Sequence, residues 1–204
     1  MSFSRTTGRP RQSSRAMLEE AASELFLEQT YAGTTIGDIT RRAGVSRTTF
    51  FNYFATKSDL LWVDVDAGLA ALPAALAQCD RAEPVTVAVR HALLTLAAGF
   101  GPGRVPWAVT QYEVMATEGE LESSALARFL VVTGRVAEFV AARPGFAADR
   151  DLAGRAFSSA VVAAAAAAAA EWAAAGVHRG DLAPYVDLAI SPVCSGFRPV
   201  LDPR

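Results

Sequence analysis

The stretch GVSRTTFFNYFATK at residues 44–57 constrains the fold more than any other part of the chain, because it predicts a tight turn and a very short helix. Gly44 accepts the left-handed backbone of such a turn without steric cost. Ser46 can then cap the helix by accepting a backbone N–H. Phe50 and Phe54 are four residues apart, so both are predicted to face inward. The other side of the helix is predicted to carry Arg47, Thr48, Thr49, Phe51, Asn52 and Tyr53.

Two further helices are predicted immediately before this stretch. Residues 13–29 are amphipathic, since their apolar side chains recur three and four apart and their acidic side chains fall on the other face. A second helix opens at residues 34–35 and buries Ile36, Ile39 and Ala43. Two helices, a glycine turn and a short third helix make a three-helix DNA-binding head, whose last helix would direct its first turn at base edges.

The string TTIGDITRRAGVSRTTFFNYFATKSDLL, residues 34–61, resembles the TetR family of bacterial transcriptional regulators. The parts of the family pattern occur in this string in the same order. They are a Thr-rich start, an Ile-x-x-Ile helix, Ala-Gly-Val-Ser, an aromatic helix, Tyr-Phe, Lys and a Leu pair. The rest of the chain is similar only in size and helical character. The resemblance implies an all-α protein with a helix-turn-helix head at residues 1–56. A helical ligand-binding and dimerisation bundle would follow at residues 57–204, with about nine helices in all.

Several head residues have side chains suited to DNA. Arg47 is predicted either to pair with a guanine or to contact a phosphate, and Thr48 and Thr49 to meet thymine methyls or phosphates. Phe51 is placed to pack on a sugar or a thymine methyl, and Tyr53 to bond a phosphate.

Four further residues complete the predicted DNA-binding set. Asn52 could read adenine, and Ser46 belongs to the set through its place at the start of the helix. By resemblance to the family, Thr35 binds phosphate, although it can equally be a plain helix cap. The resemblance also makes Lys57, the only lysine of the chain, a contact to the DNA backbone. The alternative for Lys57 is an ordinary surface lysine.

The net charge of −2 separates along the chain. Residues 1–57 hold eight Arg or Lys against five Asp or Glu, whereas residues 58–204 hold eleven against sixteen. Only the head is therefore positive. An arm with Arg5, Arg9, Arg11 and Arg15 is predicted to track phosphates or enter a minor groove; the alternative is a solvated tail.

Composition and motifs argue against other classes of protein. Cys79 and Cys194 lack metal-ligand spacing and are predicted to be reduced thiols, so no metal or cofactor is expected. No hydrolase or metalloprotease motif is present, and His91 is predicted to be a hydrogen-bonded core residue, so an enzyme is not expected. The N-terminal residues are polar and basic, and no strongly apolar run is read as a membrane span. A cytoplasmic protein is therefore expected.

The remaining chain is predicted to be helical throughout, with no alternating strand pattern. The first helix of the body should be long, with Pro73 as a kink or break, and Pro84 suits the first turn of the next one. The predicted helices span residues 57–79, 84–100, 105–118, 120–142, 149–176 and 181–197.

Residues 163–170 are eight consecutive alanines, and residues 156–170 carry no charge. Alanine is the best helix former. A long helix of small, uncharged side chains is expected to pack against another helix. By resemblance to the family, the last two long helices pair with their two-fold mates into a homodimer. The predicted interface comprises Val161, Ala165, Ala168, Trp172 and Leu188. The alternative is burial inside the monomer.

The middle helices supply the candidates for an effector site, although aromatic and Met residues at helical spacing are more often core. The candidates are Phe100, Trp107, Tyr112, Met115, Arg128 and Phe129. The run Trp62-Val-Asp64-Val-Asp66 is similar to a run in the mycofactocin-cluster regulators of actinobacteria, which implies an acyl-CoA-like effector. A small apolar or amphipathic effector is expected.

The sequence therefore predicts a ligand-responsive, homodimeric repressor that binds a pseudo-palindromic double-stranded DNA operator. Two alternatives stay open at this point: a transcriptional activator with the same head, and a regulator that has no small-molecule ligand.

Overall fold

The computed structural model describes residues 13–102, 106–146 and 148–202, and all regular elements in these ranges are helices. These residues form two compact units, which we describe separately. The first runs to Val63 and also includes Gln111–Glu120, so it extends beyond the limit predicted at residue 56. The second comprises Asp64–Thr110 and the chain from Leu121 onward.

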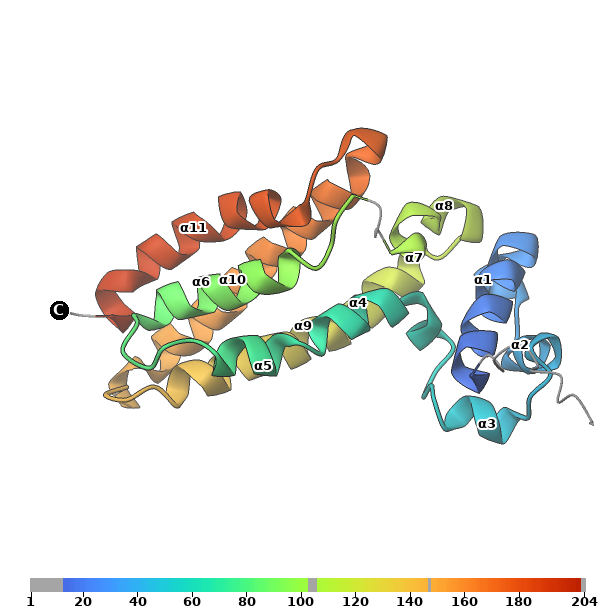
Figure 1. The fold of residues 1–204 in the computed structure, drawn as a ribbon, viewed down its shortest axis with the longest axis horizontal. Helices are drawn as coiled ribbons and strands as arrows, with labels where there is room; N and C mark the ends of the chain where they lie inside the picture. The colour runs from blue at the N-terminus through green and yellow to red at the C-terminus, as the bar shows by residue number, and fades with distance from the viewer. Residues whose placement is uncertain (1–12, 103–105, 147, 203–204) are drawn as a thin grey trace, which may run out of the picture. The chain divides into compact units, whose positions relative to one another are not determined.

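The first unit has the predicted three helices, α1 (Ser14–Gly33), α2 (Ile36–Ala43) and α3 (Arg47–Phe51) (Figure 1). Regular helical geometry in α1 stops at Gln29 and Thr30, since Thr30 has a positive φ of 67°. The predicted end of this helix at residue 29 is therefore confirmed. Leu18, Leu25 and Phe26 form its buried face, as their spacing indicates.

Short-range hydrogen bonds fix the ends of the next two helices. Thr35 and Asp38 form a reciprocal capping box at the start of α2. Gly44 ends α2 with a φ of 67°, which a glycine adopts without the steric cost that a Cβ brings. Ser46 then caps α3 by accepting from the Thr49 backbone N–H at 3.0 Å. The turn between α2 and α3 thus has the predicted chemistry.

The single helix predicted at residues 57–79 is wrong. The chain instead forms a 3-10 turn, η1 (Ser58–Leu61), and two short helices, α4 (Val63–Leu69) and α5 (Leu72–Ala77). Pro73 lies in the first turn of α5, where its missing N–H costs nothing and its ring prevents α4 from continuing. The break predicted at Pro73 is therefore confirmed, while the continuity before it is not.

The second unit is a bundle built on α6 (Val85–Ala97), α9 (Glu118–Ala141), α10 (Asp151–Ala174) and α11 (Leu182–Leu201). Helices α10 and α11 lie side by side over their length, and α6 packs against α11 and α5 (Figure 1). The bundle core includes fully buried Leu72, Val89, Val136, Phe157 and Ile190. Hydrophobic burial thus places four long segments around one core.

Two predictions about individual segments are corrected. Residues 105–118 were predicted to form one helix, but they contain α7 (Trp107–Thr110) and α8 (Tyr112–Met115), which belong to different units. His91 is not a core residue, because its side chain is 54% exposed and its Nδ1 lies 3.0 Å from Glu83 Oε1. Its polar partner lies eight residues earlier in the chain, so the apolar neighbours of His91 in the sequence did not indicate this exposed position.

Residues 148–174 are long and apolar enough to qualify as a membrane span by composition, contrary to the sequence expectation. One face of α10 packs against α11 in the bundle core. Core helices of soluble proteins have the same composition, so length and hydropathy alone do not make α10 a membrane helix.

Candidate nucleic-acid interface and effector region

Helix α3 is held in the first unit by two buried aromatic rings. Phe50 is fully buried and Phe54 is 4% exposed, and their ring centroids lie 5.6 Å apart. Both were predicted to face inward, which the structure confirms. The Ser46 cap fixes the start of the helix. Since buried rings and a cap leave α3 little freedom, its outer face is presented in one orientation.

The outer face of α3 combines a cation, hydroxyls, an amide and exposed aromatic rings. Phe51 is 53% exposed and Tyr53 is 45% exposed, which is unusual for large aromatic side chains in a small helical unit. Arg47, Thr48 and Asn52 are also exposed, whereas Thr49 is half-buried. The structure therefore brings the predicted base-reading residues together on one short surface.

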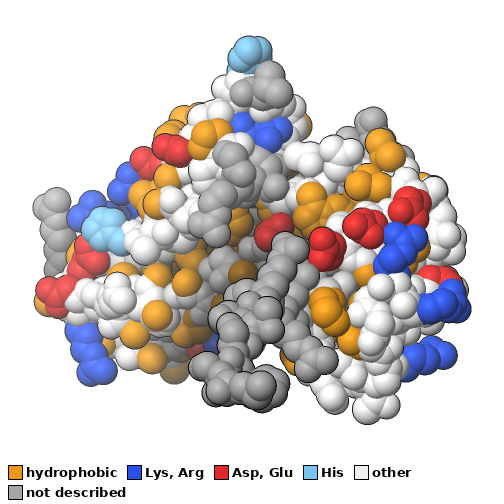
Figure 2. All heavy atoms as spheres, turned by 45° about the vertical axis from the view of Figure 1, so that its right-hand side comes forward, with side chains coloured by type: hydrophobic (Ala, Val, Ile, Leu, Met, Phe, Trp, Pro, Cys, Tyr) orange, Lys and Arg blue, Asp and Glu red, His pale blue; other side chains and the backbone are white. Residues whose placement is uncertain are grey.

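Arg47 differs from the other described arginines of the first unit. Arg42 pairs with Glu24 and Glu28, Arg41 pairs with Asp38, and Arg15 pairs with Glu19. Arg47 makes no ion pair with any described residue. Figure 2 shows one face of the molecule, on which some Lys and Arg side chains lie beside Asp and Glu side chains. An unpaired guanidinium on α3 is available for an external anion or a base edge.

Thr35 and Ser46, which lie at the starts of α2 and α3 in the predicted DNA-binding set, already form hydrogen bonds within the protein as helix caps. Thr35 Oγ1 donates to Asp38 Oδ2 at 2.6 Å, and the Asp38 backbone N–H donates to Thr35 Oγ1 at 3.1 Å. Ser46 Oγ caps α3 in the same way. Both residues remain exposed, so capping and a phosphate contact are compatible.

Lys57 has a structural position that neither interpretation from the sequence included. Its Nζ donates to the backbone carbonyls of Tyr31 at 2.7 Å and Thr34 at 2.8 Å, and lies 3.8 Å from the centre of the Tyr31 ring. Burial lowers the pKa of the Lys57 ammonium, although Glu120 opposes this. Lys57 therefore closes the turn between α1 and α2, with two of its three N–H groups occupied.

The six predicted effector residues do not lie in one unit. Phe100, Trp107, Arg128 and Phe129 belong to the second unit, whereas Met115 is fully buried in the first and Tyr112 is also assigned there. The side chain of Tyr112 lies outside what the structure describes. Phe100 and Phe129 are half-buried against the bundle core.

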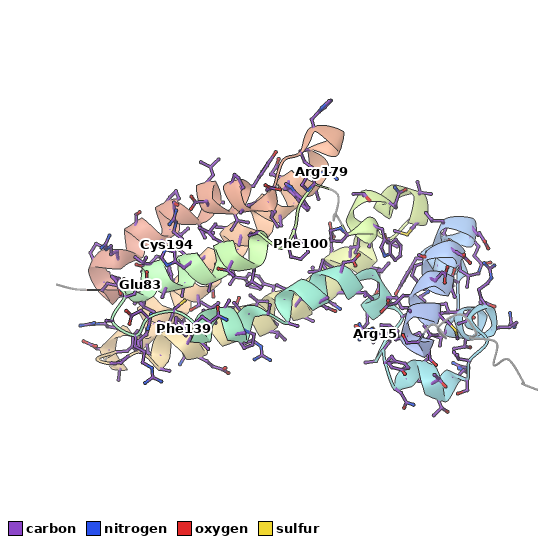
Figure 3. All side chains as sticks on the ribbon, viewed as in Figure 1. Arg15, Glu83, Phe100, Phe139, Arg179 and Cys194 are labelled. Atoms are coloured by element: carbon purple, nitrogen blue, oxygen red, sulfur yellow. The ribbon has the colours of Figure 1, made fainter. Side chains whose placement is uncertain are left out.

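Two of these residues make close contacts within the second unit (Figure 3 labels Phe100). Arg128 Nε and Nη2 donate to the two oxygens of Asp66 at 2.7 and 2.6 Å, which joins α9 to α4. The Phe100 ring lies so close to Gly68 that an added Cβ would come within 2.3 Å of Cζ. The sequence offered no signal for either pairing, because the partners are far apart in the chain.

The predicted dimer residues divide into two groups. Val161, Ala168 and Trp172 are 0%, 7% and 2% exposed in the single chain, so they contribute to its own core. This matches the alternative of burial inside the monomer. Ala165 is half-buried, and Leu188 is 80% exposed. Leu188 is thus the member of the predicted set that offers surface to a partner.

The arm arginines Arg5, Arg9 and Arg11 lie outside the described residues. Arg15, the last of the predicted arm, is in α1 and places its guanidinium 5.4 Å from the centre of the Phe54 ring. Arg15 therefore contacts the aromatic side chain that anchors α3, in addition to its ion pair with Glu19.

Two family descriptions match the chain. The description "Bacterial regulatory proteins, tetR family" matches residues 18–61, and "MftR C-terminal domain" matches residues 83–198, more than half of the chain. The first match covers α1 to η1, and the second covers most of the bundle.

Individual proteins show the same similarity. The putative mycofactocin biosynthesis transcriptional regulator MftR of Mycobacterium tuberculosis (strain ATCC 25618 / H37Rv) is 29% identical over 138 residues, covering 68% of this chain and 69% of that protein. The uncharacterized HTH-type regulator YxbF of Bacillus subtilis (strain 168) is 44% identical over 48 residues, 23% of this chain and 13% of YxbF. A transcriptional regulator from Rhodococcus sp. Rha1 (RHA1_ro04179) has a similar fold, with a TM-score of 0.51, 16% identity and coverage of 90% and 97%.

Proposed function

The chain belongs to the TetR family of bacterial transcriptional regulators, and from this premise we propose that it is a ligand-responsive homodimeric repressor of a pseudo-palindromic operator. The observation that carries the proposal is the outer face of α3, where an unpaired arginine lies beside exposed hydroxyls and aromatic rings. Large aromatic side chains on a surface are usual at binding sites. DNA offers them sugars and thymine methyls, while Arg47 suits guanine O6 and N7.

Phosphate contacts are proposed to position this face on the duplex. The exposed Thr35 and Ser46 lie at the starts of α2 and α3, where backbone N–H groups point outward. Lys57 adds positive charge beside the α1–α2 turn, and its remaining N–H is proposed to donate to a phosphate oxygen. Such contacts set the register of the protein, whereas base contacts specify sequence.

A homodimer is supported by the exposed faces of α10 and α11. Each of these helices has a stripe of exposed, uncharged residues that recur every three or four positions, as a helix packing face requires. The stripes comprise Leu152, Ala156, Ser159, Ala163, Ala166 and Ala170 on α10, and Pro184, Leu188, Pro192 and Ser195 on α11. Small side chains permit close approach of a second copy. In a two-fold dimer, the two α3 helices would read half-sites about 34–36 Å apart.

An effector is proposed to act through the second unit. Helix α9 begins in the first unit at residues 118–120 and continues in the second, where Arg128 binds Asp66 of α4. A ligand that binds one arrangement of these helices more tightly would favour that arrangement, and repression would fall if it fits DNA poorly. A small apolar or amphipathic effector, acyl-CoA-like by the resemblance of the Trp62–Asp66 run, suits the half-buried Phe100 and Phe129.

A transcriptional activator, or a regulator without a ligand, could bind DNA through the same three helices. The protein is expected in the cytoplasm in each case. The position of the operator relative to the promoter distinguishes a repressor from an activator. A thermal-shift screen with acyl-CoA thioesters of different chain lengths distinguishes a ligand-responsive protein from one without a ligand.

The proposal is tested by selecting binding sites from a pool of random DNA duplexes. We expect enrichment of an inverted repeat whose half-sites are bound by one protomer each. Arg47→Ala should enrich a repeat in which base preference is lost at one position per half-site, whereas Arg135→Ala, on the exposed surface of α9, should enrich the unchanged repeat. Enrichment of a single asymmetric site, or of no sequence, would contradict a dimeric repressor that reads bases.

A further inference from the structure

A polar cleft of about 1020 Å³ lies at one end of the second unit. Three segments that are distant in sequence form it: the loop before α6, the turn between α9 and α10, and the last turns of α11 (Figure 1). Glu83, labelled in Figure 3, belongs to the first of these segments. None of the predicted effector residues lines this cleft.

Basic side chains outnumber acidic ones in the cleft. Arg81, Arg143, Arg150 and Arg198 line it, against the carboxylates of Glu83 and Asp202. Both carboxylates are engaged within the protein. Glu83 pairs with His91, and Asp202 caps α6 by accepting from the backbone N–H of Val85 at 2.6 Å and of Thr86 at 3.2 Å. Neither of these two carboxylates therefore forms an ion pair with an arginine of the cleft.

Arg143 is held in place without being neutralised. Its Nη1 and Nη2 donate to the backbone carbonyls of Asp80 at 2.9 Å and Glu83 at 3.4 Å, and its guanidinium lies 4.7 Å from the centre of the Phe139 ring. Its Nε is buried and has no hydrogen-bond partner among the described residues. Carbonyl oxygens orient a guanidinium but carry no net charge, so Arg143 is a fixed cation at the cleft wall.

The other three arginines are free to bind an external group. Arg81, Arg150 and Arg198 make no ion pair with a described residue. A guanidinium binds phosphoryl or carboxylate oxygens through two parallel N–H bonds. The volume is that of a small-molecule site, and prolines at positions 84, 144 and 199 stiffen its walls.

We propose that this cleft binds a small polyanion, a molecule with at least two neighbouring phosphoryl or carboxylate groups. Two or more arginines from different segments would share its charges, with Arg143 as the fixed anchor. Binding would tie the α5–α6 loop, the α9–α10 turn and the end of α11 together. The site is separate from the proposed effector region and does not depend on the proposed repressor function.

Isothermal titration calorimetry of the full-length protein at low salt tests this inference, with pyrophosphate and citrate as probes of the two anion types. We expect at least one probe to bind one site per protomer and to raise the melting temperature. The probe that binds identifies the anionic group. A double variant, Arg150→Gln with Arg198→Gln, should bind the probe with an affinity about tenfold lower for each arginine removed. A charge-assisted hydrogen bond raises an affinity by about tenfold or more.

Arg135→Gln is the matched control, because it removes an exposed arginine of α9 outside the cleft. The Arg135→Gln variant should lose far less affinity than the double variant, because Arg135 does not line the cleft and cannot bond the bound anion. If the double variant folds poorly, Arg81→Gln tests the same inference separately, because it should also weaken binding of the probe. Absence of binding by both probes, or equal weakening by Arg135→Gln, would overturn the proposal.

Discussion

The ion pair between Arg128 and Asp66 joins α9 to α4 within the second unit, and Asp66→Asn is expected to weaken that junction. The carboxylate accepts two bonds from the guanidinium, at 2.7 and 2.6 Å. The Arg128 side chain is only 16% exposed, whereas that of Asp66 is 41% exposed. The amide of Asn keeps the shape of the side chain but accepts one bond and carries no charge.

The expected loss lies between two known limits. A hydrogen bond to a charged group contributes about 1.5–3 kcal/mol, while a solvent-exposed ion pair contributes about 0–1 kcal/mol. Since Arg128 is largely buried and Asp66 is accessible to water, we expect Asp66→Asn to lower the free energy of unfolding by about 1–2 kcal/mol. For a chain of this length, that loss lowers the melting temperature by roughly 3–6 °C.

Differential scanning calorimetry measures this difference, and the same helix supplies its control. Asp64 is exposed, lies two residues before Asp66, and makes no ion pair with a described residue. Asp64→Asn should therefore leave the melting temperature within about 1 °C of the unmodified protein. Equal melting temperatures for the two variants would show that the Arg128–Asp66 pair adds nothing to stability.

Three other substitutions test the DNA-binding and dimer surfaces. Arg47→Ala should weaken operator binding by about 1–3 kcal/mol and relax base preference at one position per half-site; an equal loss on all sequences in fluorescence anisotropy would make Arg47 a phosphate contact. Lys57→Met should lower the melting temperature, because two carbonyl bonds are lost, and should reduce the salt slope of DNA binding by about one per half-site. An unchanged melting temperature would refute its role in the α1–α2 turn. Leu188→Glu should give folded monomers in sedimentation velocity, since this side chain is 80% exposed and its charge would be buried only in a dimer. A normal dimer would place the interface elsewhere.

Helices α1, α2 and α3 of the first unit could be predicted in detail because their signals are local. The cap at Ser46, the turn at Gly44 and the inward pair Phe50 and Phe54 each involve residues three or four positions apart, and the structure has all of them. The exposed residues of α3 follow from the same periodicity. Their roles toward bases and phosphates remain predictions, because a side chain's chemistry does not identify its partner.

The bundle could be predicted only as a series of helices. Eight consecutive alanines have no apolar and polar sides, so the pattern could not show that Ala168 is 7% exposed while Ala163 is exposed. The same lack of contrast led to Val161 and Trp172 being assigned to a dimer interface. Burial of these residues depends on where α11 lies against α10, which periodicity within one helix does not specify.

Sequence alone thus determined the helical class, the position of the DNA-binding head and the family, because these rest on contacts between near neighbours. Tertiary structure decided the partners of the charged groups. Lys57 binds carbonyls 23 and 26 residues away, Arg128 binds a carboxylate 62 residues away, and Asp202 caps a helix that begins 117 residues earlier. Partners at such separations meet only when packing of the apolar faces has fixed the chain, so their identities are a consequence of the fold.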